Sequence, residues 1–245
     1  MESLKNYRLI IMALTGIPVL LMTDSQYGDK LLLGYGQEFA TLLVFIAFTA
    51  AYRAYPLRIK HVMLIGMFVG MAGELFLSLG LGMYHYRLEN VPLWLLFGHG
   101  LIFALVFRIS HKPWIIKKTD VIQNTLLLLA AFYSTLWLIW ANDWFGFLCA
   151  IAFMVILFSA KKSRLFFLIM FTVVCYIELI GTATGCWYWP ETAFNVPAWP
   201  TSGNPPSGIA VFYFVFDAIV FWVYMHLLHP KTKLRYQNSI LRKSS

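Results

Sequence analysis

Eight long apolar runs, separated by short polar segments, constrain the fold of this chain more than any other feature of its sequence. The runs cover residues 9–23, 38–54, 61–82, 93–109, 121–140, 144–160, 165–184 and 207–229. Most approach the roughly 20 residues that a helix needs to cross a bilayer. Backbone groups in lipid must be paired internally, and the runs are too long for barrel strands. We therefore expect an all-α, polytopic membrane bundle of eight transmembrane helices, forming a single domain over residues 1–245.

The composition points to the same environment. Hydrophobic residues make up 60% of the chain and charged residues 12%, whereas soluble domains are about 45–50% apolar and about 25% charged. The net charge of +8 would suggest nucleic-acid binding in a soluble protein. Here the basic residues lie between apolar runs, so membrane topology explains them better. We expect the lipid bilayer and a lipophilic small molecule as partners, and no nucleic acid.

The basic residues alternate between the two sides of the expected bundle. All but two of the 19 Lys and Arg residues fall in one set of connections and in the two termini, and only Lys30 and Arg87 fall in the other set. Positively charged loops stay in the cytoplasm. Both termini are therefore predicted to be cytoplasmic, in a bacterial inner (plasma) membrane. The run 9–23 is followed by no small-x-small cleavage site, so we expect it to remain as the first helix.

An internal repeat relates the two halves of the chain. Glu74 is followed by Gly82-x-Tyr84-x-Tyr86 and then Asn90-Val91-Pro92-x-Trp94. Glu178, 104 residues later, is followed by Gly185-x-Trp187-x-Trp189 and then Asn195-Val196-Pro197-x-Trp199. Glu38 and Asp143 likewise begin similar apolar runs. Chance recurrence of acids and aromatic residues at helix ends is the alternative explanation.

The repeat predicts how the helices are organised. Repeat one covers about residues 1–110, repeat two about 115–230, and a basic cytoplasmic tail follows at 231–245. Four helices in each unit is an even number, so both units have the same orientation in the membrane. This is a 4+4 parallel repeat, whose pseudo-axis runs along the membrane normal.

Four acids are the candidate catalytic residues, because an ionisable group inside a bilayer is costly and usually functional. At 1.5 Å per residue from the basic clusters, each lies roughly 20 Å above the inner membrane surface. The four are Glu38, Glu74, Glu178 and Asp217. Glycines at 66, 70, 73 and 181 mark faces where helices approach closely, so the neighbouring acids are expected to point into the bundle.

Within the runs, Arg53 and Arg108 lie only at the ends, so no intramembrane Lys or Arg is expected to neutralise these acids. Buried carboxyl groups without a cation tend to hold their protons. Such groups suit a general acid that acts on an apolar substrate, and they also suit a proton-coupled carrier. The alternative is that they only hydrogen-bond neighbouring helices.

Candidate substrate-binding residues lie next to the acids. They are His99 in the fourth run and the aromatic residues Tyr84, Tyr86, Trp187, Trp189 and Trp199. Residues 187–207, here termed the outer cap, contain five prolines and cannot be helical for long. We expect the outer cap to be an ordered cover over the acid layer, with a plain interfacial loop as the alternative.

Metal and cofactor chemistry has no support in the sequence. The three cysteines form no C-x-x-C pair of the zinc-binding type. Neither a Gly-rich phosphate loop nor a G-x-S-x-G motif is present. We expect no metal and no cofactor.

The stretch Glu178-Leu179-x-Gly181-x-x-Thr184-Gly185, followed by paired aromatic residues and a Val-Pro, resembles a motif of membrane carotenoid-biosynthesis proteins. The resemblance is to the bacterioruberin-type carotenoid hydratase family and, more loosely, to small integral-membrane lycopene and terpene cyclases. It covers about 20 residues, and Gly185 is followed here by Cys186-Trp187-Tyr188 where that family has Pro-Phe-Gly. The resemblance implies proton-initiated chemistry on an isoprenoid double bond, without metal or nucleotide.

These observations predict an intramembrane enzyme that hydrates or cyclises an isoprenoid-type substrate. Glu178 or Glu74 would donate the proton, and Asp217 would accept a proton or activate water. The aromatic rings would stabilise a carbocation through their faces. The alternatives are a small proton-coupled transporter and a non-catalytic membrane partner that docks through the outer cap.

Overall fold

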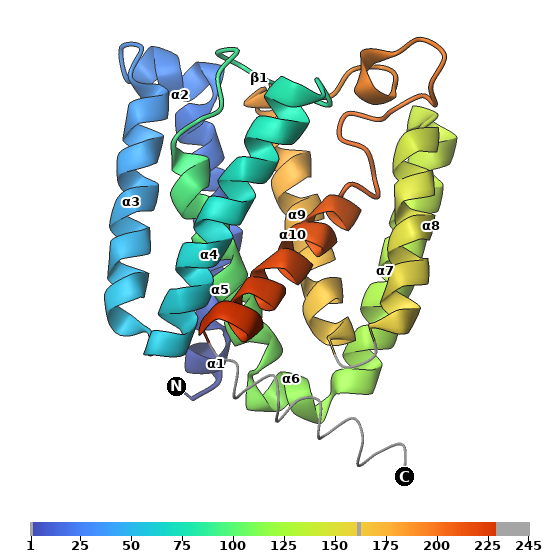
Figure 1. Ribbon diagram of the computed structural model, residues 1–245. Coiled ribbons are helices and arrows are strands. Elements are labelled where there is room, and N and C mark those ends of the chain that lie inside the picture. The colour runs from blue at the N-terminus through green and yellow to red at the C-terminus, as the bar shows by residue number, and fades with distance from the viewer. Residues whose placement is uncertain (1, 161–162, 229–245) are drawn as a thin grey trace.

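The computed structural model describes residues 2–160 and 163–228, and most of these residues are helical (Figure 1). The predicted basic tail, residues 231–245, lies outside the described residues. The apolar runs are helical over most of their described residues, which agrees with the fold class predicted from their length and composition.

Each predicted apolar run forms a helix. The helices are α1 (Glu2–Asp24), α3 (Gly36–Ala54), α4 (Leu57–Glu74), α5 (Trp94–Ser110), α7 (Thr119–Ala141), α8 (Trp144–Ser159), α9 (Arg164–Ala183) and α10 (Ala210–Val223). π-Helical segments continue α4 and α10, as η1 (Leu75–Gly80) and η3 (Tyr224–Leu228). The short elements are α2 (Gln26–Leu31), α6 (Pro113–Lys117), η2 (Ala193–Asn195), β1 (His85–Tyr86) and β2 (Trp187–Tyr188).

Several of these helices are suited to a membrane. Five helical segments are long and apolar enough to cross one: Tyr7–Asp24, Leu57–Gly80, Thr119–Ala141, Arg164–Ala183 and Ala210–Leu228. Helices α5 and α8 are shorter and also apolar. Large apolar side chains on α7, such as Leu128, Ile139 and Trp140, are well exposed, as lipid-facing residues would be. A helical protein compatible with a membrane is thus confirmed.

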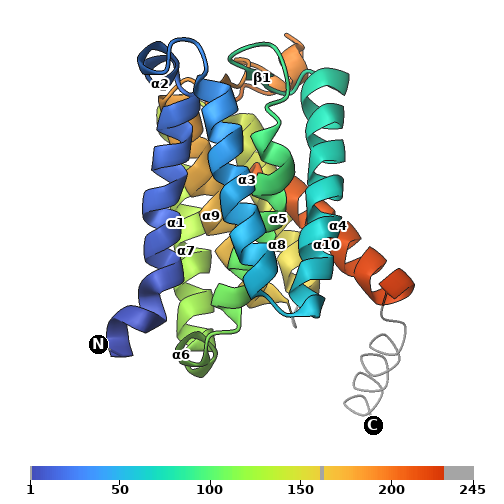
Figure 2. The same cartoon turned by 90° about the vertical axis from the view of Figure 1, so that its left-hand side faces the viewer.

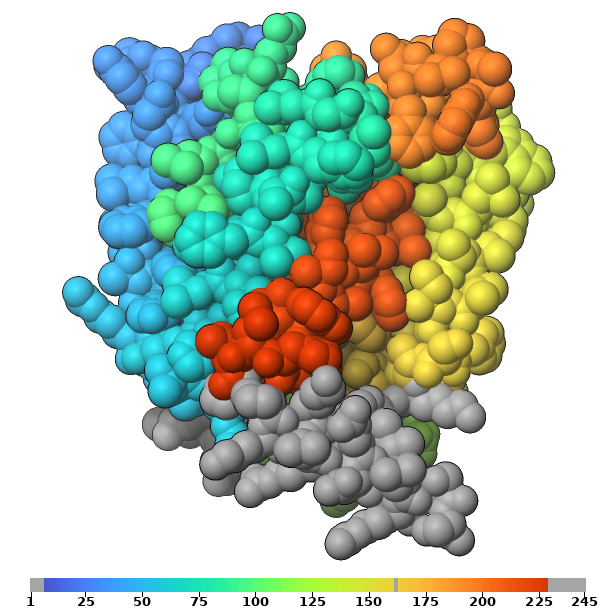
Figure 3. All heavy atoms as spheres, in the orientation of Figure 1, coloured from blue at the N-terminus to red at the C-terminus, as the bar shows by residue number. Residues whose placement is uncertain are grey.

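Helix α5 lies near the middle of one half of the bundle, where it packs against α1, α3, α4 and α9. On the other side, α7 packs against α8 and α9 (Figures 1 and 2). Helix α10 runs obliquely across one face of the molecule and contacts α4, α8 and α9 (Figure 3). Helix α2 and strand β1 lie at one end of the bundle, here termed the outer end, and α6 lies at the opposite end.

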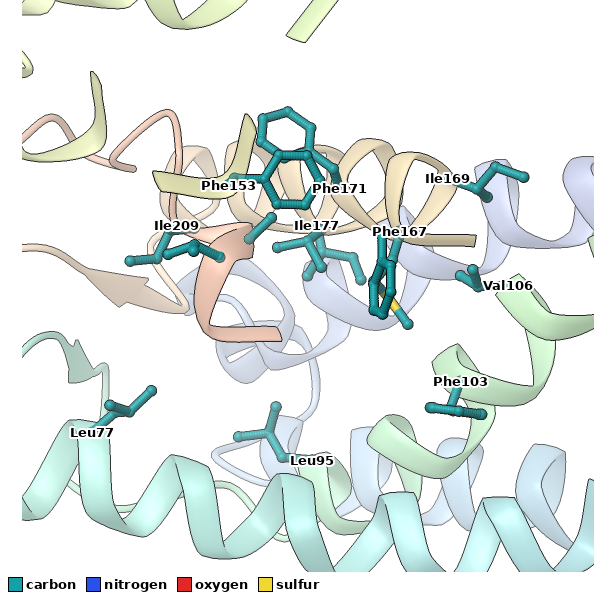
Figure 4. Close-up of a cluster of buried hydrophobic side chains, with 14 of the residues drawn as sticks. Leu77, Leu95, Phe103, Val106, Phe153, Phe167, Ile169, Phe171, Ile177 and Ile209 are labelled. Carbon is teal, nitrogen blue, oxygen red and sulfur yellow. The ribbon is translucent and has the colours of Figure 1, made fainter. Parts of the chain in front are cut away.

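Aromatic side chains from several helices fill the core. Figure 4 shows Phe153 of α8 beside Phe171 of α9, and their ring centroids are 4.9 Å apart. Phe103 of α5 packs against Phe166 of α9 at 5.3 Å. Such aromatic pairs contribute about 0.5–1.5 kcal/mol beyond the area that they bury. These contacts tie α5 and α8 to α9, the helix that carries Glu178.

The outer cap is ordered, as the sequence predicted. Its first residues form β2, which pairs antiparallel with β1, with His85 opposite Tyr188 and Tyr86 opposite Trp187. Further along, Thr192 and Thr201 form an isolated antiparallel bridge. A short strand pair therefore joins the two segments that follow Glu74 and Glu178.

Asp143 holds the far end of the outer cap to the bundle. It caps α8 by accepting a hydrogen bond from the Gly146 amide at 2.9 Å. It also accepts bonds from the amides of Gly203 at 2.8 Å and Ser207 at 2.7 Å. The side chain is fully buried, so the three amides depend on this carboxylate for their hydrogen bonds.

We therefore expect Asp143→Ala to lower the free energy of unfolding by on the order of 3 kcal/mol, because three buried amides lose their acceptor. The measurement is the unfolding equilibrium in detergent, followed by tryptophan fluorescence. The matched control is Asp120→Ala, which removes an exposed acid from the first turn of α7 and should change stability by no more than about 0.5 kcal/mol. Equal effects of the two variants would show that Asp143 does not anchor the outer cap.

Candidate active site

Two buried glutamates from different helices line one cavity near the outer end of the bundle. Glu74 ends α4 and Glu178 lies in the last turns of α9, and both side chains are buried. They line a cavity of about 860 Å³, whose other walls come mainly from α1, α3 and α5. The convergence of these two acids was predicted from their counted depths.

Glu74 is hydrogen-bonded through both of its carboxyl oxygens. Its Oε2 accepts bonds from the hydroxyl of Tyr84 and, at 2.5 Å, from that of Tyr86. Its Oε1 lies 3.0 Å from Nε2 of His99 on α5. The carboxyl group is therefore fully engaged by side chains of the loop after η1 and of a neighbouring helix.

Glu178 is hydrogen-bonded through only one of its carboxyl oxygens among the described residues. Its Oε2 accepts bonds from the indole N–H of Trp187 at 2.8 Å and of Trp189 at 3.1 Å. Among the described residues, no hydrogen bond reaches Oε1, although the side chain lines the cavity. This oxygen is thus the acidic position that remains available to a bound molecule.

The two glutamates share one local design. Each is bound by two aromatic residues that follow it after a glycine, and Gly82 and Gly185 both have a positive φ, of 62° and 70°. A positive φ is readily adopted only by glycine, so these glycines form the turns that bring the aromatic residues back to the acids. The sequence motif that defined the repeat therefore has a common structural basis around both acids.

The four aromatic residues also contact one another across the β1–β2 pair. The rings of Tyr84 and Trp189 lie 4.6 Å apart, and those of Tyr86 and Trp187 lie 6.1 Å apart. All four residues line the cavity. Their predicted role is to bind substrate, and in the structure they also donate hydrogen bonds to the two acids.

His99 changes the predicted picture of acids without a partner. It pairs with Glu74 and its ring stacks on Tyr213 of α10, with centroids 5.8 Å apart. Gly70 on α4 makes room for the ring, since a Cβ there would come within 2.2 Å of His99 Cγ. The expectation of uncompensated carboxyls is therefore wrong for Glu74, because a histidine from α5 reaches it across the helix contact.

Two predicted residues lie away from the glutamates. Glu38 is exposed in the first turn of α3, where the positive end of the helix dipole suits an acid. Trp199 is 51% exposed and packs against Phe194, beyond a turn in which Phe194 and Asn195 have positive φ. The expectation that these two side chains face the pocket is wrong.

Asp217 is buried on α10 but lines a different, small cavity of about 20 Å³ between α4, α5, α9 and α10. Its Oδ2 has no hydrogen-bond partner among the described residues. His99 and Tyr213 line both cavities, so they separate Asp217 from the glutamates. The acid is buried and faces the interior of the bundle as predicted, but it is not in the glutamate pocket.

A polar network at the outer end of the bundle was not predicted. The buried Asp24 accepts a bond from the indole of Trp94 at 2.9 Å and pairs with Arg87 at 3.5 Å. Arg87 also pairs with Asp29 at 3.2 Å. Arg87 could have indicated this network, because it lies among the outer connections, where only one other basic residue occurs. This network ties α1 and α2 to the chain beside β1.

Residues 2–160 and 163–228 contain no group of three or more His, Cys, Asp or Glu side chains that is arranged to hold a metal ion. The cavity walls are mostly apolar, with polar groups concentrated around the two glutamates and at the end near α6. The arrangement therefore provides hydrogen-bonded acids at the end of an apolar space, a geometry suited to proton transfer to a lipophilic molecule.

No family model matches this chain, and no curated protein or solved structure matches it either. The resemblance to carotenoid-biosynthesis proteins thus depends on the residues around Glu178 alone.

The tyrosines at Glu74 predict how stability depends on alkaline pH. Burial, followed by the neighbouring Glu74 carboxyl, raises the pKa of Tyr84 and of Tyr86 well above the usual value of about 10. The unfolded chain ionises these phenols first, so their contribution is complete below about pH 10 and is lost as the pH rises further. The Tyr84→Phe/Tyr86→Phe double variant should therefore lose less stability than the wild type between about pH 8 and about pH 11. Unfolding midpoints at both pH values test this, and an equal loss in both proteins would contradict it.

Proposed function

We propose that this protein is an intramembrane enzyme that hydrates or cyclises a lipophilic, isoprenoid-type alkene by proton transfer from Glu178. The observation that carries the proposal is the asymmetric bonding of this acid. Two indole N–H groups hold Oε2, whereas Oε1 has no hydrogen-bond partner among the described residues and the side chain lines an apolar cavity. Such a group is positioned and still free to deliver a proton.

The first step transfers the proton of the Glu178 carboxyl group to one carbon of the alkene. The π electron pair forms the new C–H bond, and the neighbouring carbon becomes a carbocation. The carboxylate left behind is stabilised by the indole N–H groups of Trp187 and Trp189, which already point at it. The faces of the surrounding aromatic rings stabilise the cation.

The second step consumes the carbocation and returns a proton to the enzyme. In hydration, a water oxygen bonds to the cationic carbon and its surplus proton passes to the Glu178 carboxylate. In cyclisation, the electrons of a second double bond form a C–C bond, and a proton leaves the adjacent carbon of the resulting cation. The Glu74–His99 pair, whose atoms lie 3.0 Å apart, is the second proton acceptor in the same cavity.

The proposed setting is an eight-helix bundle in a bacterial inner membrane, built as a 4+4 parallel repeat with both termini in the cytoplasm. Two features support the repeat. His85 and Tyr188, which occupy equivalent places after Gly82 and Gly185, pair with each other between β1 and β2. In the repeat, α4 corresponds to α9 and α5 corresponds to α10. Helix α5 contacts α9, and α10 contacts α4. A pseudo-twofold axis along the membrane normal would relate these two contacts.

The resemblance of the segment that begins at Glu178 to membrane carotenoid-biosynthesis proteins supports the isoprenoid class of substrate. A proton-coupled transporter is the second candidate function. The observation in its favour is that the cavity reaches from Glu178 to Arg8 and Lys112 at the other end of the bundle, a path that a carrier also needs.

The experiment compares Glu178→Gln with the wild type in a host that makes isoprenoids, with lipid extracts analysed by mass spectrometry. Gln keeps an acceptor for both indoles but has no acidic proton to transfer, so product formation should fall by about 10²-fold or more. The matched control is Asp217→Asn, a buried acid outside the glutamate pocket, which should retain most of the product.

Unchanged lipid products in cells that carry Glu178→Gln would overturn the enzyme proposal. Proteoliposomes then separate the second candidate: uptake of a lipophilic substrate that depends on a pH gradient and is lost in the same variant would identify a transporter.

A further inference from the structure

The cavity that contains the glutamates has a cationic end. It is lined there by Arg8 of α1, Arg108 near the end of α5, and Lys112, which immediately precedes α6. The start of α1, the end of α5 and helix α6 lie at the end of the bundle opposite β1 (Figures 1 and 2). The cavity thus joins two acids at one end to three basic side chains at the other.

The three cations have no acidic partner within the described part of the chain, since the ion pairs found there involve only Arg87 and His99. The guanidinium of Arg108 lies 4.7 Å from the ring centre of Tyr55, which holds it at the cavity wall. Basic residues at a membrane surface often extend to water. Here, however, three of them from separate segments border one apolar space, and together they provide positive charge for an anion.

The walls between the two ends are apolar, and several small residues form part of them. Alanines at 47, 50, 51 and 54 of α3 face the cavity, as do Ala13 and Gly16 of α1. A Cβ at Gly16 would meet no other atom within 4 Å, so the space beside it is open. Along α1, the stretch from Arg8 to Leu21 is about 20 Å long at 1.5 Å per residue, which suits an extended hydrocarbon chain.

We propose that the substrate is a long-chain lipid with an anionic headgroup, phosphate or carboxylate, which lies along this cavity. The headgroup binds at Arg8, Arg108 and Lys112, and the far end of the chain reaches Glu178. This inference deepens the proposed function, and the chemical part of the inference rests on that function. Protonation then occurs at the end of the chain remote from the headgroup. The product therefore keeps its anionic group.

Binding to the purified full-length chain in neutral detergent tests the headgroup independently of turnover. The probes are geranylgeranyl monophosphate, geranylgeraniol and palmitate, followed by quenching of tryptophan fluorescence, because Trp94, Trp187 and Trp189 line the cavity. We expect the monophosphate to bind at least about tenfold more tightly than the alcohol, a difference of about 1.4 kcal/mol. Palmitate binding as tightly as the monophosphate would support the anionic headgroup and identify a fatty acid as an equally good source of it.

Variants locate the two ends of the binding site. Arg108→Gln combined with Lys112→Gln removes two of the three cations and should reduce the preference for the monophosphate at least severalfold, while the affinity for the alcohol stays unchanged. Gly16→Leu replaces glycine by a better helix former and fills the cavity, so it should weaken binding of all probes. Leu14→Phe alters an exposed position of α1 outside the cavity and serves as the matched control, with binding like the wild type.

Equal affinities of the wild type for the monophosphate and the alcohol would overturn the inference, as would a preference that the double substitution leaves undiminished. The failure of the proposed function is a separate result. Glu178→Gln should still prefer the monophosphate, so a headgroup preference without any turnover in the wild type would refute the chemistry and retain the lipid. Turnover of an uncharged polyene by a protein without a headgroup preference would support the chemistry and refute the anionic lipid.

Discussion

The structure depends on the hydrogen bonding of two carboxyl groups buried in an apolar helix bundle. An unpaired polar group in such surroundings costs several kcal/mol, so each glutamate needs donors from the protein itself. The donors come from the chain that follows each acid: Tyr84 and Tyr86 for Glu74, and Trp187 and Trp189 for Glu178. The outer segments therefore complete the interior of the bundle, and the β1–β2 pair holds both sets of donors in place.

The different bonding of the two acids divides the proposed chemistry between them. His99 occupies the second oxygen of Glu74, while the second oxygen of Glu178 has no hydrogen-bond partner in the described chain. The first arrangement suits a fixed acceptor and the second suits a donor that meets a substrate. A cavity that runs from these acids to three basic residues also gives a role to the alanines of α3 and to Gly16 of α1, since larger side chains there would occupy the space proposed for the lipid chain.

The order of the outer cap has its own physical source. The Asp143 carboxylate accepts hydrogen bonds from three backbone amides, two of them in the outer cap. The indole of Trp137 donates a hydrogen bond to the carbonyl of Pro205 at 2.8 Å. Proline-rich chain has few backbone donors of its own, so side chains of α7 and α8 supply the contacts that fix its path. This anchoring leaves the start of the cap, with its two indoles, beside Glu178.

The sequence alone determined where the helices lie and that the chain suits a membrane, and it placed Glu74 and Glu178 together, although it put Glu38 and Asp217 in the same layer. Hydropathy, helix rise and glycine placement are local properties, so they can be read along the chain. Only the tertiary structure decided that His99 pairs with Glu74, that Asp217 has a separate cavity, that Glu38 is exposed, and that Asp24 meets Arg87. Counting residues gives the height of a side chain along its own helix, but the direction in which it points depends on the rotation and tilt of that helix, and packing against other helices sets both.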